Sequence, residues 1–276
     1  MVHNRKVFLL MTGTICPRTD TPALISLSVE ERRKMYLRAF SFYVGKLKAE
    51  GPNCCYNGIV FCENSGVDLK DFTCLAGEDK RIELISAPPD AFPAFLGKNN
   101  DFNLMDYAID RSILLSDQEC AFFKLTGRYY IKNITELFND VARGGRDLDF
   151  YCDIRDYTFY YWFAKKFHME DAEARYFYVT RSFWMDNFYQ CYKNVSHDIP
   201  VERFLLNVSR ANLKNQKCRF RFLREAYIGG DQFTSQNAPS VQCWGVRMSP
   251  EIYFGLRSIR WRIETFLRHI VPWFWF

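Results

Sequence analysis

Short apolar runs that stop abruptly at polar turns recur along this chain of 276 residues. The run Val7 to Met11 leads into Thr12-Gly13-Thr14, and the run Gly58 to Cys62 leads into Glu63-Asn64-Ser65-Gly66. A third short strand is expected from Ile82 to Ser86. Such runs are typical of buried strands. Because helical or loop segments separate them, they predict an α/β fold with a mainly parallel sheet, whose strand ends converge on one rim.

Helices are expected between these strands. Ser28, followed by Glu30 and Glu31, has the composition of a helix start, and the helix should end at Gly51. Residues 97–116 carry apolar side chains at an amphipathic helical spacing, and a further helical segment is expected from about Met185 to Asn212.

The segment AFFKLTGRYYIKN, residues 121–133, indicates a ligand site. Residues 120–123 have the composition of a buried strand, and Gly127 supplies the freedom to turn out of it. Lys124, Thr126, Arg128 and Tyr129 would then gather at the strand's carboxyl end, where open α/β sheets bind ligands. A guanidinium fork, an ammonium group and neutral donors suit an anionic ligand. The alternative is an ordinary strand and turn with an exposed basic pair.

Composition narrows the class of protein. Hydrophobic residues form 48% of the chain, which is enough to bury a substantial core. The net charge of +5 is mild, so nucleic acid is not an expected partner. The ten cysteines contain no Cys-x-x-Cys pair, and several lie inside apolar runs, which favours reduced thiols in a cytosolic compartment. The four histidines show no metal-ligand spacing. P-loop, Gly-x-Gly-x-x-Gly and Gly-x-Ser-x-Gly motifs do not occur.

Several carboxylates are candidates for holding a divalent cation or for acting as a general base. Asp147 and Asp149 have Asp-x-Asp spacing, but the preceding RGGR favours an exposed loop with solvated charges. Single acids near predicted strand ends or helix faces could act as the base, and the sequence does not select among them. These are Glu63, Asp106 and Glu202.

The C-terminal residues 249–276 form a basic, aromatic-rich segment. Arginines alternate there with Ile259, Trp261, Ile263 and Phe266, and four of the last five residues are aromatic. An amphipathic helix of this composition suits the surface of an anionic bilayer. The alternatives are a helix packed back onto the domain and a contact between copies of the chain.

KLTGRY at residues 124–129 resembles the Lys-x-Thr-Gly-Arg-Tyr signature of glycosyltransferases from bacterial cell-surface polysaccharide clusters, which build capsule, O-antigen or lipooligosaccharide. Further segments occur in the order seen in that family, and the resemblance covers about residues 5 to 235. They are the strand start VFLLMTGTI, Arg32 with Tyr36, the strand end from Ile59 to Gly66, and Asp153 with Arg155.

The resemblance implies a single GT-A-like (Rossmann-like) domain that takes a nucleotide-activated sugar at the rim of the sheet. The sugar would pass to a lipid-linked or growing glycan. Donor-binding residues implied in this way are Thr12, Thr14, Asn64, Ser65, Lys124, Thr126, Gly127, Arg128, Tyr129 and Arg155, and the catalytic candidates are Glu63, Asp153 and Glu202. Where many such enzymes carry Asp-x-Asp, this chain has Lys124 to Arg128, so dependence on Mg²⁺ or Mn²⁺ stays open. Positive groups there could offset the charge of the leaving diphosphate.

We therefore expect a glycosyltransferase domain over residues 1–248 and a membrane-surface anchor over 249–276. Lipid-linked acceptors lie at the cytoplasmic face of the membrane, so the expected location is cytoplasmic and peripheral on that face. Two alternatives use the same basic cluster. One is a non-catalytic assembly protein that binds anionic lipid or polysaccharide, and the other is a phospho-sugar transferase.

Overall fold

The structure is a computed structural model, and it describes residues 5–17, 28–88, 91, 100–145, 147–155, 171–191, 200–224, 226 and 228–229. The basic aromatic segment 249–276 lies outside the described residues. No helix within the described ranges is both long enough and apolar enough to cross a bilayer.

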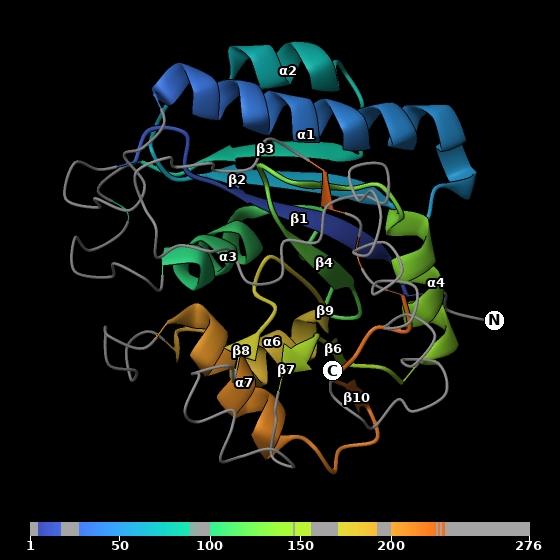
Figure 1. The fold of residues 1–276 in the computed structure, drawn as a ribbon. Coiled ribbons are helices and arrows are strands. Elements are labelled where there is room, and N and C mark those ends of the chain that lie inside the picture. The colour runs from blue at the N-terminus through green and yellow to red at the C-terminus, as the bar shows by residue number, and fades with distance from the viewer. Residues whose placement is uncertain are drawn as a thin grey trace, which may run out of the picture.

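A seven-stranded sheet forms the centre of the fold, in the order β10-β6-β9-β4-β1-β2-β3 (Figure 1). The four strands β3, β2, β1 and β4 are parallel, whereas β9 runs antiparallel to both β4 and β6. Two reversals restore the direction, so β6 and its parallel neighbour β10 point the same way as β4. The bounds are β1 Val7–Gly13, β2 Gly58–Glu63, β3 Ile82–Ser86, β4 Ala121–Thr126, β6 Phe150–Tyr151, β9 Tyr176–Thr180 and β10 Cys218–Arg219.

The predicted α/β class with a mainly parallel central sheet is confirmed. Helices cover both faces of the sheet, with α1 and α2 on one side and α3 and α7 on the other (Figure 1). Two short antiparallel pairs lie outside the sheet, β5 Tyr130–Ile131 with β11 Ile228–Gly229 and β7 Ile154–Arg155 with β8 Asp171–Ala172. The helices are α1 Val29–Glu50, the 3-10 helix η2 Gly51–Asn53, α2 Lys70–Ala76, α3 Asn100–Arg111, α4 Ile134–Arg143, α6 Arg181–Asn187 and α7 Val201–Ala211.

Helix α1 has the predicted limits because both ends carry strong local signals. The Ser28 hydroxyl accepts a hydrogen bond from the Glu31 backbone N–H, and the Glu31 carboxylate accepts one from the Ser28 N–H in return. This capping box satisfies two N–H groups that a helix start otherwise leaves unpaired. At the other end, Gly51 has φ 54°, a conformation that favours glycine.

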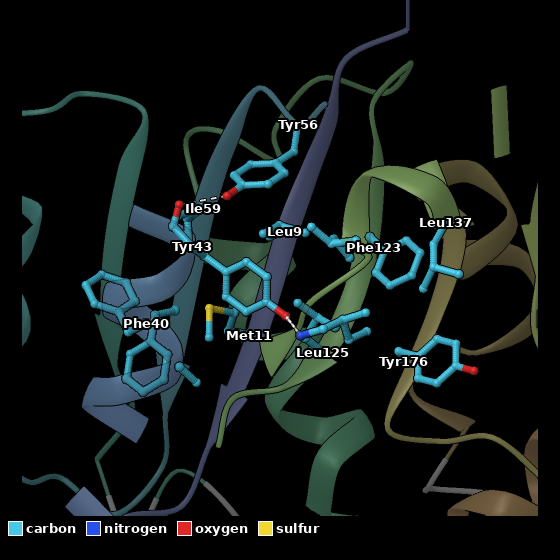
Figure 2. Close-up of a cluster of buried hydrophobic side chains, with 14 of the residues drawn as sticks. Leu9, Met11, Phe40, Tyr43, Tyr56, Ile59, Phe123, Leu125, Leu137 and Tyr176 are labelled. Atoms are coloured by element: carbon cyan, nitrogen blue, oxygen red, sulfur yellow. Dashed lines mark hydrogen bonds between the residues drawn. The ribbon is translucent and has the colours of Figure 1, made fainter. Parts of the chain in front are cut away.

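Strand side chains alternate between two cores, one on each face of the sheet. Leu9 and Met11 of β1 enter the first core, which lies beneath α1, α2 and α4 (Figure 2). Phe8 and Leu10 enter the second core, on the other face, with α3, α6 and α7. In the first core the Tyr43 hydroxyl accepts a hydrogen bond from the Ile131 N–H at 2.8 Å. These layers hold the sheet rigid beneath its carboxyl rim.

Two expectations about local structure are wrong. The expected helix from Met185 to Asn212 is interrupted, because α6 ends at Asn187 and Gln190 has φ 54°, which no helix accommodates. Strand β4 also runs further than expected, through Thr126. Lys124 therefore lies inside a buried strand and not at its tip. Its ammonium group can be buried there because three acceptors surround it.

Candidate functional site

The carboxyl ends of β1 and β4 form the topological switch point of the sheet. The chain adds β2 and β3 on one side of β1 and then crosses to add β4 on the other. In open α/β sheets ligands bind in the crevice outside the strand ends at such a point. The turns that border it are Thr12-Gly13-Thr14 and Thr126 to Tyr129, as the sequence predicted.

Glycine is needed at this crevice because the two turns approach each other closely. The Gly127 N–H donates to the Thr12 carbonyl at 2.7 Å, and a Cβ on Gly127 would lie 2.7 Å from that same oxygen. A Cβ on Gly13 would lie 2.9 Å from the Phe61 ring. Neither glycine has a positive φ. Gly127 was expected to let the chain turn, but the structure needs glycine there because the two backbones pack closely.

Arg32, on the first turns of α1, is part of the family resemblance, but the sequence did not predict that it binds a ligand. Its side chain is only 2% exposed, and its Nε donates to the carbonyl oxygens of Thr14 and Ile15 at 3.0 and 3.2 Å. Nη2 also donates to Thr14, whereas Nη1 is buried without a hydrogen-bond partner. Among the described residues no carboxylate forms an ion pair with Arg32. Burial lowers its pKa, and the nearby Arg128 lowers it further.

Tyr36, one helical turn after Arg32, lines the same crevice. Its hydroxyl accepts a hydrogen bond from the Thr14 N–H at 3.1 Å, and burial raises its pKa. The guanidinium of Arg128 lies near enough to both Tyr36 and Arg32 to influence their pKa values, and it stacks over the Tyr129 ring with its Cζ 4.9 Å from the centroid. Two guanidinium groups therefore lie close together at the switch point, an arrangement that attracts an anion.

Lys124 is buried and fully engaged by the protein. It is 1% exposed, and its Nζ donates to Asp101 Oδ2 at 2.8 Å, to Thr126 Oγ1 at 3.1 Å and to the Ala174 carbonyl at 2.6 Å. An ammonium group has three donors, and all three are used. Lys124 thus joins α3, β4 and the approach to β9, and it is not the exposed basic residue of the alternative interpretation.

The turn after β2 is held by Glu63, which is fully buried. Its Oε1 accepts from the Ile15 N–H and its Oε2 from the Ser65 N–H, each at 2.9 Å, and the Ser65 hydroxyl also donates to it. The neighbouring Asn64 is 8% exposed, and its Oδ1 is buried with no hydrogen-bond partner. Glu63 thus ties the β1 turn to the β2 turn, and Asn64 keeps an unused acceptor.

The remaining predicted residues lie in different settings. Thr12 is 1% exposed and donates weakly to the Leu125 carbonyl at 3.4 Å. Asp153 follows β6, so it lies toward the same rim, where it accepts from the Phe222 N–H at 2.6 Å and the Tyr176 hydroxyl at 3.1 Å. Arg155 lies in β7, but its side chain is not among the described ones. Glu202 lies in the first turn of α7, and no described contact brings it to the crevice.

Asp101, in the first turn of α3, is a second residue that the sequence did not single out. Its Oδ2 holds Lys124, and it lies near enough to Tyr36 to raise the pKa of that phenol. No described residue donates to its Oδ1. Asp106, which the sequence offered as a possible base, instead binds the Trp184 indole N–H and the Gln190 N–H, each at 2.8 Å.

The described carboxylates at this rim do not fit a divalent-cation site. Glu63 and Asp153 each use both oxygens on backbone or hydroxyl donors, and Asp101 is paired with Lys124. Asp149 of the Asp-x-Asp sequence lies at the opposite edge, where it meets Arg5 and Lys217. No group of three or more potential metal-binding side chains gathers anywhere in the described part of the chain.

No protein-family model matches the sequence, and no curated protein matches it. Several solved structures match it in part. The mannosyltransferase Ktr4p from S. cerevisiae in complex with GDP superposes with a TM-score of 0.35 and 11% identity over 69% of this chain and 60% of that chain. The bifunctional glycosyltransferase WbbM superposes with a TM-score of 0.41 and 10% identity over 80% of this chain and 39% of that chain. This chain thus spans less than two thirds of the length of either protein.

Proposed function

We propose that this protein is a glycosyltransferase that binds a nucleotide-activated sugar in the crevice between the β1 and β4 turns. The observation that carries the proposal is Arg32, a buried guanidinium with an unpartnered Nη1 and no described carboxylate partner. A buried cation is costly unless an opposite charge meets it. An anionic ligand at the switch point supplies that charge.

The diphosphate of a nucleotide-sugar has the chemistry that this crevice needs. Arginine binds phosphate oxygens through parallel N–H donors, and Arg32 with Arg128 offers two such groups within a short distance. Because Gly13 and Gly127 have no side chains, the two turns pack closely and the ligand can approach their backbone. When the bond from sugar to phosphate breaks, positive groups already in place stabilise the negative charge that develops on the leaving diphosphate.

Thr14, Asn64 and Tyr129 complete the proposed donor pocket. Arg32 positions the carbonyl of Thr14 directly, and the free Oδ1 of Asn64 can accept a hydrogen bond from a sugar or ribose hydroxyl. The acceptor hydroxyl needs a carboxylate within reach to take its proton. We assign that role to Asp101, because no described residue donates to its Oδ1 while both oxygens of Glu63 and Asp153 are engaged.

The proposed acceptor is a lipid-linked or growing cell-surface glycan, and the proposed location is the cytoplasmic face of the membrane. What supports this is the segment 249–276, in which Arg260 and Arg262 flank Trp261 and which ends in PWFWF. Arginine with interfacial tryptophan favours an anionic bilayer surface.

The test is calorimetric titration of the full-length chain with UDP-, GDP-, CMP- and dTDP-sugars, with the Arg32→Lys and Arg32→Met variants beside it. We expect one nucleotide class to bind, at least tenfold weaker binding in Arg32→Lys because the bidentate fork is lost, and no binding in Arg32→Met. Lys34→Met is the matched control, because Lys34 lies on the same helix with its side chain 71% exposed. Binding by none of the donors, or equal binding by Arg32→Met, would overturn the proposal. Thermal unfolding of each ligand-free variant separates lost affinity from lost folding.

A further inference from the structure

Tyr36, on α1, lies where the β1 and β4 turns meet. Its side chain belongs to a residue that is only 3% exposed. A Cβ on Gly13 would lie 3.5 Å from its Cε1 atom, and a Cβ on Gly127 would lie 3.3 Å from its Cδ1 atom. One edge of the buried ring therefore contacts both turns, and a ligand bound at the crevice lies beside it.

The hydroxyl of Tyr36 is held in place, but its proton is not used by the protein. The oxygen accepts a hydrogen bond from the Thr14 N–H at 3.1 Å, which fixes it beside the β1 turn. A hydroxyl also carries one donor, and no described residue accepts the proton of Tyr36. Burial raises the pKa of the phenol, so it keeps that proton at neutral pH. Tyr36 therefore offers one unused hydrogen-bond donor at the crevice.

Charged groups of the crevice surround this hydroxyl. Arg32 and Arg128 lower the pKa of Tyr36 and Asp101 raises it, so all three lie near the phenol. Arg32 also binds the carbonyl of Thr14, the residue whose N–H holds the Tyr36 oxygen, and its own Nη1 is buried without a partner. The hydroxyl is thus a neighbour of the guanidinium groups that we expect to hold the diphosphate and of the carboxylate that we expect to act as base.

Contacts join Asp101 to the same turn. Lys124 donates to Asp101 at 2.8 Å and to Thr126 at 3.1 Å, and Thr126 directly precedes Gly127. The base must reach the acceptor hydroxyl, which attacks the sugar carbon from about 3–3.5 Å, and the leaving phosphate is bonded to that same carbon. A donor that neighbours both the base and the diphosphate site is therefore best placed for the phosphate that carries the sugar.

We propose that the Tyr36 hydroxyl donates a hydrogen bond to the phosphate that carries the sugar, and that this bond strengthens when the diphosphate leaves. The inference rests on the proposed glycosyltransferase function. The bond from the sugar carbon to the phosphate oxygen breaks, and its electron pair goes to that oxygen. The acceptor oxygen forms the new bond to the carbon, and the acceptor proton passes to Asp101. Tyr36 keeps its own proton and stabilises the charge that the phosphate gains.

The experiment compares the full-length wild type with Tyr36→Phe and Tyr43→Phe by calorimetric titration with nucleoside monophosphates, nucleoside diphosphates and nucleotide-sugars. Tyr43 is the matched control, because it lies two turns further along α1 in the first core (Figure 2) and its hydroxyl accepts from the Ile131 N–H at 2.8 Å. No described residue accepts the Tyr43 proton either. Both substitutions remove a buried acceptor for a backbone N–H, so both should lower ligand-free stability similarly.

We expect a graded loss of affinity in Tyr36→Phe. It should bind the nucleoside diphosphate about tenfold more weakly, because a hydrogen bond to a charged group is lost, and the nucleotide-sugar about threefold more weakly. Its affinity for the monophosphate should stay within about twofold of the wild type, and Tyr43→Phe should bind all three ligands as the wild type does. An equal loss for all three ligands, or wild-type binding of the diphosphate, would overturn the role of Tyr36 and leave the proposed function standing.

Binding of no nucleoside diphosphate by the wild type would overturn both the role of Tyr36 and the proposed function. If Tyr36→Phe fails to fold, near-ultraviolet difference absorption of the Tyr129→Phe variant decides the matter, because that variant lacks the phenol of the β4 turn. Inorganic pyrophosphate, which does not absorb there, should shift tyrosine absorption to the red, as expected of a phenol that donates to phosphate. Saturation by pyrophosphate without a shift would refute the contact.

Discussion

The Gly127 N–H and the Thr12 carbonyl oxygen lie 2.7 Å apart, and a Cβ on Gly127 would lie at that same distance from that same oxygen. Gly127→Ala must therefore push the β4 turn away from the β1 turn. We expect a loss of about 1–3 kcal/mol in the free energy of unfolding, the range for a buried overpacked site, together with weaker donor binding. Urea denaturation and calorimetry measure the two effects.

Gly45→Ala is the control for that substitution. Gly45 lies within α1, and an added Cβ there meets no atom within 4 Å. Alanine should stabilise the helix by about 0.5–1 kcal/mol. If Gly127→Ala behaved as Gly45→Ala does, the close approach of the two turns would be refuted.

Lys124→Met should destabilise the protein. The substitution leaves Thr126 and the Ala174 carbonyl without their shared donor and Asp101, whose side chain is 37% exposed, without its partner, and we expect a loss of about 1–3 kcal/mol. Lys34→Met, at a side chain 71% exposed, should change the free energy of unfolding by less than about 0.5 kcal/mol. Equal stability of the two variants in urea would contradict the buried network.

Asp101→Asn should lower kcat while leaving donor affinity within a fewfold. Loss of a general base typically costs about 10²–10⁴ in rate. The measurement is turnover with the donor found by calorimetry. The control is Asp110→Asn, at the far end of α3, where the carboxylate accepts from the Tyr189 hydroxyl. Wild-type turnover in Asp101→Asn would return the role of base to Glu63, Asp153 or Glu202.

Stability should fall at alkaline pH. Burial raises the pKa values of Tyr36, Tyr43 and Tyr56, so the folded chain keeps protons that the unfolded chain releases above about pH 10. The unfolded state then binds fewer protons, and the free energy of unfolding decreases with rising pH by up to about 1.4 kcal/mol per pH unit for each tyrosine. The stabilisation is complete below the unfolded pKa and is lost above it.

Urea denaturation between pH 8 and pH 11 checks this dependence. Tyr56→Phe should reduce the pH dependence of the free energy of unfolding by the contribution of about one proton. It should also lower the free energy of unfolding by about 1 kcal/mol, because the Tyr56 hydroxyl donates to the Tyr43 carbonyl at 2.7 Å. A slope identical to that of the wild type would show that Tyr56 does not titrate on unfolding.

The C-terminal segment should bring the chain to anionic membranes. The double variant Trp273→Ser and Trp275→Ser removes two aromatic side chains from the last four residues, and we expect it to sediment less with vesicles that contain phosphatidylglycerol. Donor binding should not change. Retention of full vesicle binding would contradict the anchor, and a parallel titration in high salt measures the arginine contribution.

The sequence predicted the features that local chemistry decides. Strand β1, the two ends of α1 and the polar turns at the rim follow from apolar runs and from capping by Ser28 and Gly51. It could not predict the partners of charged residues. Arg32 is one of three consecutive basic residues on α1, and only the packing of the β1 turn against that helix shows that it is the buried one. Lys124 looked like a strand tip because its acceptors come from residues 101 and 174, far away in the chain.

The antiparallel strand β9 has a consequence for synthesis of the chain. By the time Thr126 has been made, β1, β2, β3 and β4 can already pair, yet β4 has nothing on its other side until Tyr176 to Thr180 emerge. During that interval the apolar segment AFFKLT presents an open strand edge, which invites pairing with other nascent chains. Chains truncated before β9 should therefore aggregate, and we expect the folding yield of this protein in the cell to depend on how quickly the ribosome delivers the next fifty residues.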